Sequence, residues 1–237
     1  MTSWPQRPSP TGMHDGAPGL HASVPDSATP AAPTSAPSTT TSFAVTWDYR
    51  CPFARNAHDH VLTALEAGAD WDVTFLAFSL GQAHVEPGET DVWDEPERDS
   101  GLFALQCGVA VRDFMPEHFL AAHRALFEHR HARGGHLRRP DDIRDVLAGA
   151  GVDPEAVFEI VETGKPLATI KSEHTSYAAS HEVWGVPTFI VGDQAAFVRL
   201  MDRTNGNVAT ARTAVERIVD LLRWPSLNEF KHTSVPS

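Results

Sequence analysis

Residues 43–68 read FAVTWDYRCPFARNAHDHVLTALEAG. The first five are β-branched, aromatic or small and alternate in character, which predicts a short strand that ends at Asp48. Cys51 and Pro52 then begin a helix, because the N–H that proline lacks would have no partner at the first helical position. Apolar residues follow at helical spacing until Gly68. The sequence therefore places Cys51 at the junction of a strand and a helix.

A cysteine at the start of a helix lies beside free backbone N–H groups and the positive end of the helix dipole. Both favour the thiolate, so we expect the pKa of Cys51 to fall from about 8.5 to roughly 6. Such a thiol is a nucleophile at neutral pH. The alternative is that Cys51 is a small buried hydrophobic residue, as many free cysteines are.

A second segment strengthens the prediction of a nucleophile. Residues 183–192 read VWGVPTFIVG. We expect a helix to end near Gly185 and a strand to follow at once, with Pro187 at its start, where a proline removes no hydrogen bond from the sheet.

Together the two segments resemble the thioredoxin superfamily, and specifically its DsbA-like branch. The resemblance implies an α/β, thioredoxin-like fold with an inserted α-helical domain. It also implies that Pro187 is a cis proline facing Cys51, that Val186 lies beside the sulfur, and that backbone near Thr188 helps to present an extended substrate. Substrate-binding residues are then expected around both motifs, namely Trp47, Tyr49, Pro52, Phe53, Val186, Pro187 and Thr188. Trp47 and Tyr49 are equally well explained as packing residues.

The sequence departs from this family at one position. The usual motif is Cys-x-x-Cys, but here Ala54 stands where the second cysteine would be. The expected chemistry is therefore monothiol. Cys107 is the other cysteine of the chain, and we expect it to be a packed helical residue. It would instead resolve an adduct on Cys51 if the two Cα atoms lay within about 4.4–6.8 Å.

The composition is that of a globular protein large enough to bury a core, with 237 residues of which 41% are hydrophobic. A formal charge of −12 and a pI near 5.4 argue against nucleic acid and against a membrane as partners. The chain has no apolar run of membrane-spanning length and no signal-peptide pattern, and two cysteines are too few for a disulfide scaffold. We therefore expect a cytoplasmic protein.

The chain divides into five parts. Residues 1–42 hold eight of the eighteen prolines and three charged residues, which predicts a disordered Pro/Ser/Thr-rich segment. The two halves of the thioredoxin-like domain are expected at 43–80 and 166–223, with the helical insertion at 81–165 between them. A tail follows at 224–237. Within the insertion, apolar periodicity predicts helices that begin near Leu102, Pro116, Pro140 and Pro154.

Two polar features were weighed as sites. The net-acidic loop 79–101 is expected to be solvated surface rather than the lining of a cleft. The thirteen histidines do not pair at the spacing of a metal site, so no metal is expected. His58 and His60 are expected on the surface.

The tail reads WPSLNEFKHT at 224–233, and it is similar to the tail of actinobacterial DsbA-like proteins related to mycothiol-dependent nitroreductases. This resemblance implies an oxidoreductase in which Cys51 attacks a disulfide or another electrophile and a small thiol, such as mycothiol, releases it. Kappa-class glutathione transferases and hydroxychromene carboxylate isomerases share the layout, with a single hydroxyl residue at the Cys51 position. A redox-inactive module that binds peptides through the Pro187 edge is a further alternative.

Overall fold

The computed structural model describes residues 40–227. The predicted disordered segment lies outside these residues except at its end, and so does the tail beyond residue 227. Thr41 and Ser42, which were assigned to the disordered segment, belong instead to the first strand. They extend it because they pair with Trp71 and Asp72 of the neighbouring strand.

Four strands form one sheet in the order β2-β1-β3-β4. They are β1 (Thr41–Trp47), β2 (Trp71–Ala77), β3 (Thr188–Val191) and β4 (Gln194–Phe197). β1 and β2 run parallel and are joined by α1 (Pro52–Glu66). β3 pairs antiparallel with β1 and β4 antiparallel with β3. Because β1 and β2 are parallel, their carboxyl ends meet at one edge of the sheet, directly before Cys51.

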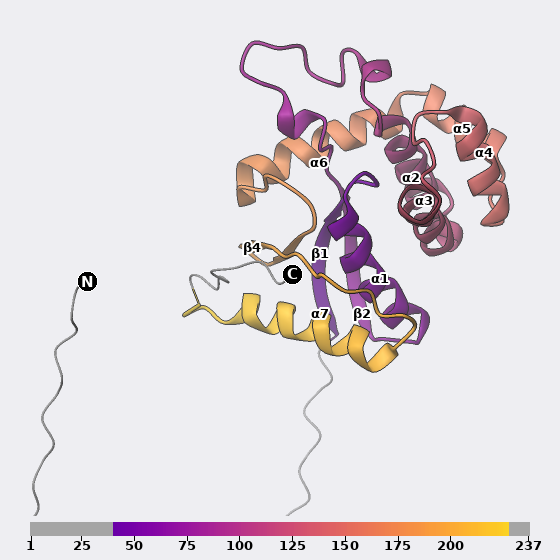
Figure 1. Cartoon of the computed structure of the whole chain (residues 1–237). Coiled ribbons are helices and arrows are strands. Elements are labelled where there is room, and N and C mark those ends of the chain that lie inside the picture. Colours follow the sequence, from indigo (N-terminus) through magenta and orange to yellow (C-terminus); the bar gives the residue numbers. More distant parts are fainter. Residues whose placement is uncertain (1–39, 228–237) are drawn as a thin grey trace, which may run out of the picture. The chain divides into compact units, whose positions relative to one another are not determined.

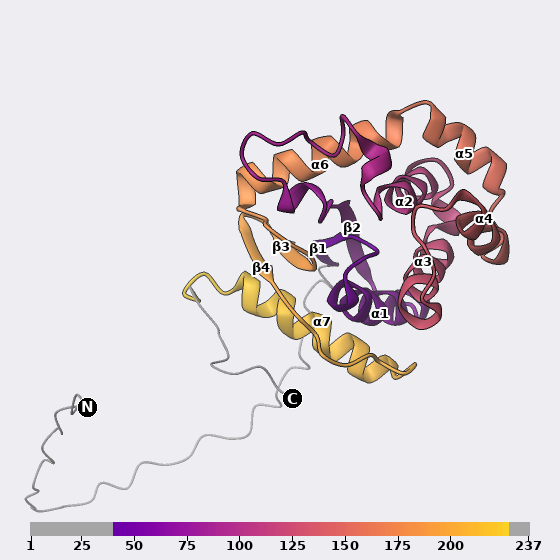
Figure 2. The same cartoon turned by 45° about the horizontal axis from the view of Figure 1, so that its top comes forward.

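Four helices separate β2 from the helix that returns to the sheet. They are α2 (Leu102–Phe114), α3 (Phe119–Arg133), α4 (Pro140–Gly149) and α5 (Pro154–Glu162). Figures 1 and 2 show them gathered in one cluster, from which α6 (Lys165–His181) runs back towards β3. Pro116 begins a short 3₁₀ turn, Pro116–His118, and α3 starts just after it. The other three predicted helix starts, at Leu102, Pro140 and Pro154, are confirmed.

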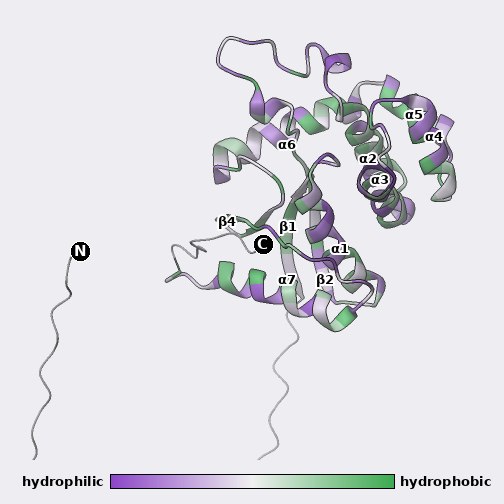
Figure 3. Cartoon of the chain, viewed as in Figure 1, coloured by the Kyte–Doolittle hydropathy of each residue, from purple (hydrophilic) through white to green (hydrophobic). Residues whose placement is uncertain are grey.

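The last helix, α7 (Val208–Arg223), lies beside α1 in both views (Figures 1 and 2). Hydrophobic and hydrophilic colour alternate along it in Figure 3, the pattern of a helix with one face on a sheet. Its buried side chains, Ala211, Val215 and Val219, recur every four residues on that face. No helix within residues 40–227 is both long and apolar enough to cross a membrane.

Candidate active site

Cys51 is the N-cap residue of α1. Its backbone is extended, with φ −86° and ψ 119°, and its sulfur accepts a hydrogen bond from the N–H of Ala54 at 3.4 Å. Pro52 occupies the first turn of the helix, as the sequence predicted. The side chain of Cys51 is almost buried, with 8% of the residue exposed. The thiol therefore lies at the helix start with a narrow path to solvent.

The Gly-Val-Pro-Thr segment at 185–188 contacts the sulfur of Cys51. The peptide bond between Val186 and Pro187 is cis, as the resemblance implied. The thiol of Cys51 donates to the carbonyl oxygen of Val186 at 3.2 Å. Segments 135 residues apart in the sequence therefore form one site.

Two threonines hold the proline loop against β1. The N–H of Thr188 donates to the hydroxyl of Thr46 at 2.8 Å, and the hydroxyl of Thr188 donates to the carbonyl of Gly185 at 2.8 Å. Both threonines are buried, so these bonds are shielded from water. They fix the position of Val186 relative to Cys51.

An ion-pair network holds the turn that precedes the thiol. The guanidinium of Arg50 binds the carboxylate of Asp48 at 2.8 Å and that of Asp99 at 3.1 Å. Asp48 also accepts from the N–H of Leu80 at 2.8 Å, which ties the end of β1 to the loop after β2. Both carboxylates are almost fully buried. The position of Cys51 is thus fixed from the β1 side as well.

Burial raises the pKa of Cys51 above its ordinary value of 9.0. The N–H groups of Ala54 and Phe53 lower this pKa, as does the positive charge of Arg199, whereas Asp48 raises it. The loss of water outweighs the stabilising groups. The prediction of a lowered pKa is therefore wrong, although the helix start that motivated it is present.

The other expected site residues divide into two groups. Val186 contacts the sulfur, and Pro187 and Thr188 follow it in the same loop, while Pro52 is exposed and Phe53 is half-buried. The guanidinium carbon of Arg199 lies 5.0 Å from the centre of the Phe53 ring, which places a positive charge beside the site. Trp47 and Tyr49 are fully buried. Of the two explanations left open for them, the structure favours packing.

Sequence reasoning missed a buried chain of hydrogen bonds behind Tyr49. His58 Nε2 lies 3.1 Å from the carbonyl of Thr46, which can only accept, so Nε2 carries the proton. Neutral His58 then accepts at Nδ1 from His123 Nε2, at 2.9 Å. His123 in turn accepts at Nδ1 from the hydroxyl of Tyr49, at 2.8 Å. We call Tyr49, His123 and His58 the histidine chain.

Burial lowers the pKa of His58 to about 4 and that of His123 well below its ordinary value. The expectation that His58 and His60 lie on the surface is wrong, because both are buried. α3 covers the face of α1 that carries His58 and brings His123 to it. Nothing in the sequence near residue 58 indicates this cover.

Cys107 lies in the middle of α2 and is completely buried. Burial raises the pKa of its thiol far above the ordinary value. Both cysteines are free thiols. The prediction of Cys107 as a packed helical residue is confirmed.

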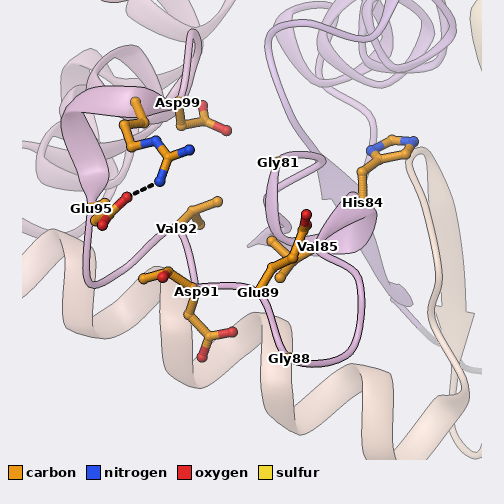
Figure 4. A pocket seen from close by; sticks show the side chains of 11 residues that line it. Gly81, His84, Val85, Gly88, Glu89, Asp91, Val92, Glu95 and Asp99 are labelled. Atoms are coloured by element: carbon orange, nitrogen blue, oxygen red, sulfur yellow. Dashed lines mark hydrogen bonds and ion pairs between the residues drawn. The ribbon is translucent and has the colours of Figure 1, made fainter.

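The acidic loop encloses a cavity of about 510 Å³, lined by residues between Gly81 and Asp99 (Figure 4). Figure 4 labels Asp91, Glu95 and Asp99 along this loop, and Glu95 pairs with Arg98. Cys51 does not line this cavity. Asp99 links the loop to the site through Arg50.

Comparison with protein families finds a match to part of the chain. Residues 109–208 match the family model of the DSBA-like thioredoxin domain, a range that contains Pro187 but not Cys51. No match was found among curated protein sequences.

Three solved structures resemble the chain, each with a TM-score of 0.50. A thioredoxin-like oxidoreductase from Silicibacter pomeroyi is 20% identical, over 76% of this chain and 86% of that one. DsbA from Pseudomonas aeruginosa is 19% identical, over 81% of this chain and 88% of that one. The cytosolic disulfide reductase DsbM from the same organism, solved with GSH, is 15% identical, over 76% and 99%. The chain has a DsbA-like thioredoxin fold.

Proposed function

We propose that this chain, with a DsbA-like thioredoxin fold and a single thiol at its site, is a monothiol oxidoreductase that exchanges thiols and disulfides through Cys51. One observation carries the proposal: the sulfur caps α1 and lies 3.2 Å from the carbonyl of Val186, next to Pro187. This brings the nucleophile and the backbone of the proline loop to one place.

The reaction has two exchange steps. The Cys51 thiolate attacks one sulfur of a disulfide, forms a mixed disulfide and expels the other sulfur as a thiolate. A low-molecular-weight thiol, for which the tail resemblance suggests mycothiol or a similar compound, attacks the mixed disulfide and releases Cys51. In the net reaction, one half of the substrate disulfide leaves as a thiolate and the other half forms a disulfide with the small thiol. Ala54 in place of a second cysteine makes the external thiol necessary.

The raised pKa of Cys51 favours reduction of substrates over oxidation. A site that stabilises its thiolate favours its own reduced form and is a strong oxidant. Here burial disfavours the thiolate, so that driving force is absent and a mixed disulfide on Cys51 is comparatively stable. Reductive chemistry of this kind fits a cytoplasmic protein.

Mass spectrometry tests the proposal. The full chain is incubated at pH 9 with a small symmetrical disulfide, and we expect the mass of one adduct at Cys51, removed on adding a small thiol. The Cys107→Ser variant is expected to form the same adduct and Cys51→Ser none. If Cys51 stays unmodified up to pH 10, the oxidoreductase proposal fails, and the functions that need no bond to Cys51 remain.

One observation favours a second candidate, an enzyme that holds a thiol cofactor without forming a bond to it. The Cys51 thiol is protonated and already donates a hydrogen bond, as a hydroxyl residue at this position does in the kappa-class layout. A serine would preserve such a donor but not the sulfur nucleophile. Activity with a small-thiol cofactor that survives Cys51→Ser would therefore select this candidate.

A further inference from the structure

A positively charged segment runs past the candidate site in a chain that is otherwise acidic. Residues 129–139 contain four arginines and three histidines and no acidic residue, although the chain carries a net charge of −12. This segment comprises the end of α3 and the turn that follows it. The function proposed above does not explain it.

Part of this segment lines a cavity of about 250 Å³, which Arg50, the residue before Cys51, also lines. We call it the arginine pocket; its lining residues are Arg50, Ser100, Arg130, His136, Leu137 and Arg138. No carboxylate is among them. Within residues 40–227, neither Arg130 nor Arg138 forms an ion pair. Two guanidinium groups therefore lack a counter-charge at one cavity.

The turn that carries these groups is held in place. Gly134 ends α3 in the left-handed conformation, with φ 67°. Leu137 is buried and its carbonyl accepts from the N–H of Ala104 at 3.0 Å. Arg130 donates to the carbonyl of Gly135 at 3.3 Å. A ligand that binds here has little backbone to immobilise, which reduces the entropic cost of binding.

The two carboxylates that bind Arg50 do not line the pocket. Asp48 and Asp99 accept three of the five guanidinium N–H bonds of Arg50, and two remain. The three arginines of the pocket and these two carboxylates carry a formal charge of +1 together. Among the described residues, the unpaired positive charges of the pocket are those of Arg130 and Arg138.

Two contacts connect the pocket to the turn that carries the thiol. Arg50 and Cys51 are neighbours, so their Cα atoms are about 3.8 Å apart. His131, next to Arg130, contacts the carbonyl of Tyr49 through Nε2 at 2.9 Å, which fastens the end of α3 to the turn before the thiol. The pocket therefore borders the turn that carries the thiol, and Cys51 itself is not among its lining residues.

We propose that the arginine pocket binds the carboxylate or phosphate group of the small thiol or disulfide that reacts at Cys51. This inference rests on the function proposed above and narrows it. Among small thiols it favours those with a carboxylate or phosphate, and so it departs from mycothiol, the uncharged thiol that the tail resemblance suggested. Guanidinium groups bind carboxylate and phosphate through paired N–H donors, which makes the preference specific for planar or tetrahedral oxyanions.

Two alkylating reagents that differ in charge test the inference. Iodoacetate carries a carboxylate and iodoacetamide is neutral, and both modify the same sulfur. The ratio of their rate constants at Cys51 is measured at pH 9 by mass spectrometry. We expect Arg138→Gln and Arg130→Gln each to lower the ratio about fivefold by slowing iodoacetate alone, since one nearby charge is removed. Inorganic phosphate is expected to slow iodoacetate and spare iodoacetamide.

Arg139→Gln is the matched control, because Arg139 adjoins Arg138 but does not line the pocket. Its ratio is expected to stay within twofold of the wild-type ratio. An unchanged ratio in both pocket variants, or an equal fall in Arg139→Gln, would overturn the inference and leave the oxidoreductase proposal standing. If Cys51 reacts with neither reagent, the oxidoreductase proposal itself fails.

Discussion

The helix start at Cys51 and the histidine chain both hold titratable side chains out of water, and they differ in how completely those groups are paired. In the histidine chain each ring nitrogen and the hydroxyl of Tyr49 has one partner. At Cys51 the sulfur has contacts at 3.2 and 3.4 Å, and Arg130 and Arg138, which line a cavity with the preceding residue, have no counter-ion among the described residues. A closed set of hydrogen bonds specifies a core, whereas an open set leaves groups for a ligand.

The largest expected effect separates the two thiols that belong to these regions. Cys51 has a path to solvent, and Cys107, beside the histidine chain, has none. We expect Cys51→Ala to abolish alkylation of the native protein and Cys107→Ala to leave its rate unchanged, a contrast of roughly a hundredfold or more. Peptide mapping after iodoacetamide treatment measures it. Labelling of Cys107 in the native protein at a comparable rate would erase the distinction.

The next effect concerns acid stability of the histidine chain. The unfolded chain protonates histidine near pH 6.5, but folded His58 does so only near pH 4. The unfolded state therefore binds more protons in this window, and the free energy of unfolding falls as the pH drops from 6.5 to 4. His58 alone accounts for about 3 kcal/mol of this loss. Urea denaturation at pH 7, 6 and 5 measures the slope.

Two variants test whether His58 causes this pH dependence of the free energy of unfolding. His58→Gln should reduce it, whereas His118→Gln, where 42% of the side chain is exposed, should leave it unchanged. Equal slopes in the two variants would mean that the histidine chain titrates like the surface, against its burial.

Cys51 should show the opposite response to pH. Because burial raises the pKa of Cys51 above its ordinary value, the thiolate fraction grows about tenfold for each pH unit across the neutral range. The alkylation rate should rise in the same way from pH 6.5 to 8.5 without levelling off. Arg199→Gln should displace the curve to higher pH, since Arg199 lowers this pKa. A plateau below pH 8 would restore the low pKa that the sequence suggested.

The strands Thr41–Trp47 and Thr188–Val191 and most helix starts could be predicted from the sequence because local signals mark them. Proline at a helix start and the Gly-Val-Pro-Thr segment carry their meaning within a few residues. The cis bond and the contact with Val186 followed from a family resemblance rather than from propensity.

The pKa of Cys51 and the burial of His58 could not be predicted in this way. Both depend on what covers α1, and that cover includes α3, about 60 residues further along the chain. The helix-start effect on the thiol is local, whereas its desolvation sums contributions from the whole fold. The arginine pocket escaped notice for the same reason, since its residues come from three separate segments.

The smallest expected effect tests whether the two regions are energetically separate. Tyr49→Phe removes the hydroxyl that donates to His123 and leaves a buried ring nitrogen unpaired, which should cost about 1–2 kcal/mol of stability. Tyr177→Phe, where the side chain is partly exposed, should cost less than about 0.5 kcal/mol. Urea denaturation at pH 7 measures both.

The same Tyr49→Phe variant should leave the pH profile of Cys51 alkylation unchanged, although Tyr49 is two residues from the thiol. The hydroxyl points into the core, where its partner is His123, and the sulfur interacts with Ala54 and Val186 instead. A shift of the profile by half a pH unit or more would show that the histidine chain tunes the thiol. Its closed hydrogen bonding would then serve the site as well as the core.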